Sequence, residues 1–152
     1  MRNFSALLVL LSLAGCFQGP DRAPVILGAK RPDAALAERV AQQLEKSGCR
    51  VVRRFDLASA ADADRAVTSG AVDATLESQR TALVDVLKKP VPESMTIEHV
   101  VRPQYINRGL LWSPPLGRGD LAVVFRKDID RKCREATRAL MRTAYIADNP
   151  GS

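Results

Sequence analysis

The sequence predicts a single α/β lobe with three layers and a mostly parallel sheet. Short apolar runs alternate with amphipathic segments between residues 25 and 89. Each segment of helical pattern ends at a residue that stops helices, namely Gly48, Gly70 or Pro90. The connections between segments are short. This alternation is typical of βαβ units, in which helices cover both faces of parallel strands.

The first strand is expected at residues 25–27, followed by a turn at 28–30. A helix should follow, with Asp33 as its N-cap and Gly48 just beyond its end. Its buried face is marked by apolar residues at helical spacing, Leu36, Val40, Ala41 and Leu44. A second strand is expected at 51–55.

The second helix is expected to begin at Ser59 or Asp62, since both residue types cap helices, and to end at Gly70. A third strand should occupy 72–76. The third helix is predicted over 79–89 and stopped by Pro90, with Leu83, Val84 and Leu87 facing inward.

The pattern is looser after residue 90. Residues 91–94 form a linker, and 96–102 read as a strand or as the start of a helix that Pro103 interrupts. A short helix at 105–108, strands at 110–112 and 120–126, and a turn at 113–117 follow. The last helix is expected over 131–145, with Asp128 or Asp130 as its cap.

The N-terminus has the pattern of a secretory signal peptide over residues 1–15. Its apolar run, 6–14, is too short to span a membrane. It ends in Leu13-Ala14-Gly15-Cys16, which resembles the lipobox of bacterial lipoproteins. That resemblance implies cleavage before Cys16 and acylation of its thiol; the alternative is an ordinary signal peptide with Cys16 incidental. Residues 16–24 would be a lipidated tether, 25–147 the lobe and 148–152 a flexible tail.

A lipid anchor would place the protein in the cell envelope, on the periplasmic side of the outer membrane or the outer face of the cytoplasmic membrane. The chain has a formal net charge of +6, and its basic residues are scattered. Nucleic acid is not expected as a partner, whereas anionic lipid headgroups could attract such a surface.

No motif for catalysis or for metal binding stands out. The chain has one histidine, His99, no Gly-x-Ser-x-Gly, no P-loop and no metal-ligand spacing. We therefore expect neither an enzyme nor a cofactor or metal. Besides Cys16, the cysteines are Cys49 and Cys133, which form either a disulfide or two separate thiols.

The order and residues of these elements resemble the substrate-binding proteins of ABC importers for glycine betaine, choline, carnitine and related osmoprotectants. The matching stretches include 27–30, 51–54, 108–112 and 121–128. The resemblance implies an α/β lobe, a small-molecule solute and an ABC permease as partner. Members have two lobes that close on the ligand, but this sequence matches the first lobe only, over roughly residues 25–128.

The ligand-contacting positions depart from the family. Pro32 stands where the family usually carries Phe, and Thr75 and Ser78 where it carries Tyr. A quaternary ammonium ion needs such aromatic faces, because it donates no hydrogen bond. Arginines stand at or beside the expected mouth of the site and suit a carboxylate or phosphate instead. The predicted ligand-binding residues are Lys30, Arg31, Glu77, Gln79, Arg80, Thr81, Arg118 and Asp120.

Two functions follow from this resemblance. The first is a solute-binding-like module with altered or lost ligand binding, for a quaternary amine or a small anion. The second is an interaction module that uses the uncovered cleft face, with Tyr105, Trp112 and Leu116 near it. Its partner would be an envelope protein or a second copy of the chain. Alternatively, the predicted site residues are only exposed loop residues.

Overall fold

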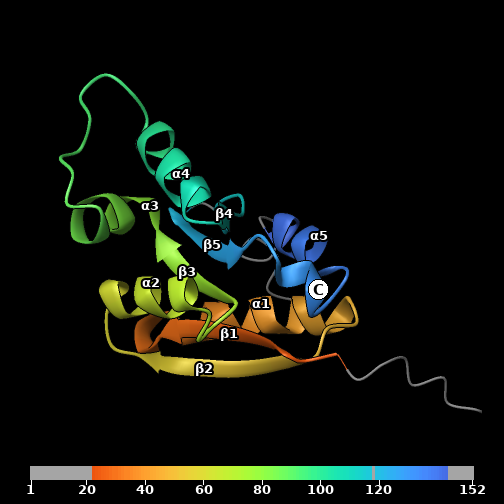
Figure 1. Ribbon diagram of the computed structural model, residues 1–152. Helices are drawn as coiled ribbons and strands as arrows, with labels where there is room; N and C mark the ends of the chain where they lie inside the picture. Colours follow the sequence, from red (N-terminus) through yellow and green to blue (C-terminus); the bar gives the residue numbers. More distant parts are fainter. Residues whose placement is uncertain (1–21, 118, 144–152) are drawn as a thin grey trace, which may run out of the picture.

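A single sheet of five strands forms the centre of the protein (Figure 1). The computed structural model describes residues 22–117 and 119–143. In chain order the elements are β1 (Val25–Lys30), η1 (Arg31–Asp33), α1 (Ala34–Lys46), β2 (Val51–Leu57), α2 (Ala60–Ser69), β3 (Ala74–Ser78), α3 (Gln79–Thr81), η2 (Ala82–Val86), α4 (Ile97–Asn107), β4 (Leu110–Trp112), β5 (Leu121–Arg126), η3 (Ile129–Arg131) and α5 (Ala136–Met141).

The strand order is β2-β1-β3-β5-β4. β1 pairs in parallel with β2 and β3, while β5 pairs antiparallel with both β3 and β4. Because β5 is antiparallel to both of its neighbours, β4 runs in the same direction as β1, β2 and β3. The prediction of a mostly parallel sheet is therefore confirmed, with β5 as the reversed strand.

Helices cover both faces of the sheet and make three layers. One core cluster packs α1 and α5 against residues such as Leu27, Leu76 and Phe125. The other packs α2, η2 and α4 against Leu57 and Val124 on the opposite face. The three-layer α/β lobe is thus confirmed. Within the described ranges, no helix is long and apolar enough to cross a membrane.

The first two helices lie where the pattern placed them. Gly48 and Gly70 follow α1 and α2 with positive φ angles of 86° and 82°, a conformation that glycine adopts at little cost. Of the two expected caps, Ser59 begins α2, and its side chain accepts a hydrogen bond from the Asp62 N–H. The helix therefore starts at the earlier of the two residues.

The first and third strands differ from the prediction at their ends. β1 continues to Lys30, so the expected turn at 28–30 is wrong. A Cβ at Gly28 would lie 2.9 Å from Leu57 Cδ1 and 3.1 Å from Val72 Cγ1, so this glycine serves close packing inside the strand. β3 begins and ends two residues later than expected, so it includes Glu77 and Ser78.

The predicted helix over 79–89 is shorter and less regular. It consists of α3 and then the π-turn η2, which ends at Val86. The Leu87 N–H bonds to the Ala82 carbonyl, the i→i+5 pattern of a π-helix. This wider turn changes which side chains face the core. Val84, predicted to face inward, is 41% exposed, whereas Leu83 is buried.

Pro103 does not interrupt the segment after the linker, as the sequence had suggested. It lies inside α4, which runs continuously through both expected pieces. The Pro103 ring is on the exposed side of the helix. There the carbonyl that loses its N–H partner can be hydrated, which reduces the cost of proline in a helix.

The last helix begins at Ala136 and not at Arg131. The intervening stretch holds Cys133, which forms a disulfide with Cys49 across 84 residues of sequence. The Asp130 side chain accepts a hydrogen bond from the Thr137 N–H at 2.9 Å and so stabilises the first turn of α5. The first part of the predicted helix is instead the 3-10 turn η3, and Cys133 lies between this turn and α5. Its predicted end at residue 145 lies outside the described residues.

Candidate functional site

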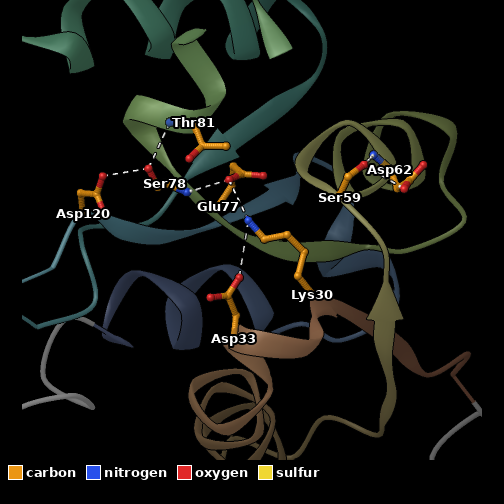
Figure 2. Close-up of polar contacts among 8 residues, drawn as sticks. All are labelled: Lys30, Asp33, Ser59, Asp62, Glu77, Ser78, Thr81 and Asp120. Atoms are coloured by element: carbon orange, nitrogen blue, oxygen red, sulfur yellow. Dashed lines mark hydrogen bonds and ion pairs between the residues drawn. The ribbon is translucent and has the colours of Figure 1, made fainter. Parts of the chain in front are cut away.

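Four of the predicted ligand-binding residues, Lys30, Glu77, Thr81 and Asp120, lie where the carboxyl ends of β1 and β3 meet (Figure 2). Gly28 pairs with Thr75 in parallel register, which places Lys30 beside Glu77 two residues later. Lys30 Nζ lies 3.3 Å from Glu77 Oε1. In open α/β sheets, ligands bind outside the carboxyl ends of the strands, so this is the expected position for a site.

Lys30 lies between two carboxylates. Besides Glu77, it contacts Asp33, whose Oδ2 is 3.5 Å from Lys30 Nζ. Asp33 precedes α1 as predicted, but its side chain makes no cap hydrogen bond to that helix. It is instead directed towards Lys30, as Figure 2 shows. The ammonium charge of Lys30 is therefore already balanced within the protein.

Glu77 is the buried member of this group, at 2% exposure. Its Oε1 also accepts a hydrogen bond from the Ser78 N–H at 3.0 Å. Burial raises the pKa of the Glu77 carboxyl above its ordinary value, and the positive charge of Lys30 offsets part of that rise. The ion pair thus compensates for a carboxylate that would otherwise be costly to bury.

Ser78 links this ion pair to the loop that precedes β5. Its Oγ accepts a hydrogen bond from the Thr81 N–H at 3.1 Å and donates one to Asp120 Oδ2 at 2.8 Å. The first bond caps α3, and the second holds the residue just before β5 against the end of β3. The site is therefore a fixed polar network across three chain segments.

A small polar space lies behind Glu77, on the α2 and α4 side of the sheet. It is too narrow for a water molecule and is lined by Asp64, Thr75, Glu77 and Tyr105, among others. Arg108 Nη2 donates to Asp64 Oδ2 at 2.6 Å, and its guanidinium lies 5.1 Å from the centre of the Tyr105 ring. These groups hold α2 to α4 and are part of the protein's interior.

Four of the eight predicted site residues belong to this network, namely Lys30, Glu77, Thr81 and Asp120. Arg31, Gln79 and Arg80 lie beside it, and in the part of the chain that is described, Arg31 and Arg80 form no ion pair. Arg118 lies outside the described residues.

The sequence reasoning missed Asp33 and Ser78 as members of the network. Their signals were present. Asp33 follows Lys30 by three residues, and Ser78 stands directly between a strand and a helix, the usual place of an N-cap.

Four aromatic residues of the described ranges lie in the core or pack against it. Tyr105 and Trp112 are 1% and 3% exposed, and their rings meet edge to face with centroids 5.1 Å apart. Phe125 is fully buried, and Phe55 packs against the cluster with α1. No aromatic face among these four described residues is therefore free to hold a cation at the Lys30–Glu77 edge.

The burial of Tyr105, Trp112 and Leu116 corrects the expectation that they lie on an exposed apolar face. Leu116 is only 2% exposed. The reason is that α4 packs against the sheet and covers β4, while Leu116 joins the core on the α1 and α5 side. The interaction hypothesis consequently loses the apolar residues on which it was based.

Few groups in this network suit catalysis. His99 is exposed on α4, away from the buried core. Within residues 22–117 and 119–143, no group of three or more side chains is arranged to hold a metal ion. What the arrangement provides chemically is charge and hydrogen bonding at a strand edge, which suits binding.

No protein-family model and no curated protein matches the sequence. Among solved structures, the chain is similar to apo YehZ from Escherichia coli, with a TM-score of 0.54 and 22% sequence identity. The similarity covers 62% of this chain and 36% of that one. At this identity it shows the fold, and the chain spans about a third of the length of YehZ.

Proposed function

We propose that the chain is a lipid-anchored, solute-binding-protein-like module related to ABC importers of quaternary ammonium osmoprotectants, and that its ligand binding is altered. The α/β lobe, its likeness to part of YehZ and the motif order support this proposal. An ABC permease is the partner that such a module would serve.

The observation that best supports altered ligand binding is the ion pair between Lys30 and Glu77. Lys30 and its neighbours place fixed charge at the strand ends, where a quaternary ammonium ion would need aromatic faces. Pro32 lies in an exposed turn, Thr75 is buried, and Ser78 caps α3. None of these three residues can replace an aromatic ring, so betaine and choline should not bind.

A small anion is the ligand class that this edge favours. Arg31 and Arg80 are both exposed at the edge, and a guanidinium group can hold a carboxylate or phosphate through two parallel hydrogen bonds. The Lys30 charge is compensated by Asp33 and Glu77, so the two arginines supply the available positive charge.

A thermal-shift screen of the chain from residue 17 onward tests this function. We expect no shift with glycine betaine or choline, and a higher melting temperature with small carboxylates or phosphate. At a hundredfold excess over Kd, a ligand of the native state adds about 2.7 kcal/mol. Arg31→Ala with Arg80→Ala should abolish the shift. Arg65→Ala with Arg138→Ala is the matched control, since both residues are exposed and each already has an ion-pair partner, Asp62 and Glu135.

Lipid anchoring has its own test. The proposal predicts that Cys16 is diacylated or triacylated in cells and that the protein fractionates with membranes. Intact-mass analysis of the purified protein measures the acyl groups directly. Cys16→Ser should release the protein into the soluble fraction, and an unmodified Cys16 in the wild type would contradict the anchor.

A further inference from the structure

A surface opening lies at the end of the sheet where the parallel strands begin, opposite the Lys30–Glu77 pair. It is a surface cavity of about 390 Å³ beside the disulfide. Its walls come from the entry to β1, the turn after α1 and the stretch before α5. The residues lining it include Arg22, Cys49, Arg50, Lys132, Cys133, Arg134 and Glu135.

The cavity is strongly basic. Four of its side chains are cationic and one, Glu135, is acidic. Glu135 is already bonded to Arg138 at 2.8 Å, and Lys132 is bonded to the buried Asp73 at 2.9 Å. Arg22 and Arg134 are exposed at the cavity. An anion that entered would meet Arg22 and Arg134, which have no carboxylate partner among the described residues.

A neighbouring opening of about 250 Å³ extends the basic surface. It shares Lys132 with the first cavity and adds Arg126 and Arg131. Its exposed carboxylate, Asp128, accepts a hydrogen bond from Arg126 at 3.1 Å. The beginning of the sheet therefore carries a continuous basic surface made of the residues that line these two openings, which we call the basic edge.

The disulfide fixes the centre of the basic edge. Arg50 follows Cys49 directly, and Lys132 and Arg134 flank Cys133. One covalent link between Cys49 and Cys133 thus sets the spacing of three cations that come from segments far apart in the sequence. Preorganised charges lose little conformational freedom when they bind an anion.

The position of this edge in the chain indicates what lies opposite it. Arg22 follows Cys16 by only six positions in the sequence. A fully extended segment of that length spans roughly 20 Å. If Cys16 carries the lipid anchor proposed above, the basic edge is held close to the bilayer surface, and the Lys30–Glu77 edge is at the opposite ends of the strands.

We infer that the basic edge binds the phosphate headgroups of anionic phospholipids in the membrane that carries the anchor. This inference rests on the proposed lipid anchoring. Each basic side chain close to an anionic bilayer strengthens binding about fivefold. The contact orients the lobe, with the beginnings of its strands towards the membrane and the candidate solute site away from it.

Vesicle sedimentation tests the inference with the unacylated chain from residue 17 onward, which retains both core clusters. We expect the chain to sediment with vesicles of phosphatidylcholine mixed with phosphatidylglycerol, and not with phosphatidylcholine alone. Binding should weaken as salt rises. The double variant Arg22→Glu with Arg134→Glu should bind the mixed vesicles at least about 25-fold more weakly, because it removes two basic side chains worth about fivefold each and adds two negative charges.

The matched control is Arg54→Glu with Arg65→Glu, which changes the net charge equally on exposed residues away from the basic edge. It should retain most of the vesicle binding. Equal loss in both variants would overturn the inference, because it would show attraction to net charge alone. Equal sedimentation with neutral vesicles would also overturn it.

Inorganic phosphate separates a lipid surface from a soluble anion. Phosphate that competes fully at the same phosphoryl concentration would mark a pocket for a free anion and contradict the lipid assignment. Because the tested chain lacks Cys16, its vesicle binding does not depend on acylation. Failure of the anchor is seen separately, in the mass of the protein from cells.

Discussion

Lys30 Nζ lies 3.3 Å from Glu77 Oε1, and this ion pair joins two residues that are 47 positions apart in the sequence. It links the ends of two parallel strands at the edge where a solute would bind. The pair therefore has two consequences, one for the stability of the lobe and one for the ligands that the edge accepts.

Replacing Lys30 by methionine should destabilise the lobe by about 2 kcal/mol at neutral pH. The substitution keeps the aliphatic length of the side chain but leaves the buried Glu77 carboxylate without its charged partner. Urea unfolding followed by circular dichroism measures the loss. An unchanged midpoint would contradict the role of the pair.

The double variant Lys30→Met with Glu77→Gln provides the control for that result. It removes both charges, so no unpaired carboxylate remains in the interior. We expect it to recover at least half of the stability lost in the single variant, since a neutral pair costs less to bury than a lone charge.

The raised pKa of Glu77 predicts a pH dependence with a definite sign. The native state holds the Glu77 proton to a higher pH than the unfolded chain does. In the unfolded chain, the carboxyl has its ordinary pKa of 4.5. The stability due to this group is therefore fully present below pH 4.5 and is lost as pH rises through the folded pKa. Relative to the wild type, Glu77→Gln should gain stability as pH rises.

Glu38 supplies the opposite control. Hydrogen bonds from Arg53 lower the pKa of the Glu38 carboxyl. The stability that Glu38 contributes is therefore present above pH 4.5 and is lost as pH falls through the folded pKa. Glu38→Gln should therefore lose stability relative to the wild type as pH rises. Urea titrations at a series of pH values measure both slopes, and the same sign in both variants would contradict this assignment.

Removing the disulfide should cost about 2–5 kcal/mol, because Cys49 and Cys133 close a long loop in the unfolded chain. The variant Cys49→Ala with Cys133→Ala and the reduced wild type should show similar losses in thermal melts. Reduction should have no effect on the double variant. A wild-type melting temperature that is insensitive to reductant would argue for two separate thiols.

Truncating Trp112 tests whether it belongs to the core or to a binding surface. Trp112→Ala should destabilise the lobe by about 3–5 kcal/mol, because the indole packs against Tyr105 in a buried cluster. Trp112→Phe should cost less, since the indole Nε1 has no hydrogen-bond partner among the described residues. A small effect of Trp112→Ala would contradict the burial of this side chain in the core.

The sequence predicted the regular elements of the lobe well where its signals are local. Apolar spacing predicted α1, and Gly48 and Gly70 marked two helix ends because the residue after a helix often adopts a positive φ, which glycine tolerates at little cost. The signal at Pro103 misled, since the cost of a proline in a helix depends on whether its ring faces solvent, and tertiary packing decides that.

The candidate site was predictable only in part. Parallel strands bring their carboxyl ends to one edge, so Lys30 and Glu77 could be placed near each other from the strand order alone. Their pairing, the turn of Asp33 towards Lys30 and the bond from Ser78 to Asp120 depend on register and rotamers. The sequence does not encode those locally. The burial of Tyr105 and Trp112 likewise follows from how α4 packs on β4.

Isothermal titration of glycine betaine into the chain from residue 17 onward is the most direct test of the central claim. The account predicts no binding heat, because the Lys30–Glu77 pair occupies the strand ends and the described aromatic rings lie in the core. Saturable binding with a Kd of about 1 mM or tighter, lost in Lys30→Met, would show that this edge still takes quaternary ammonium ions and would contradict the account.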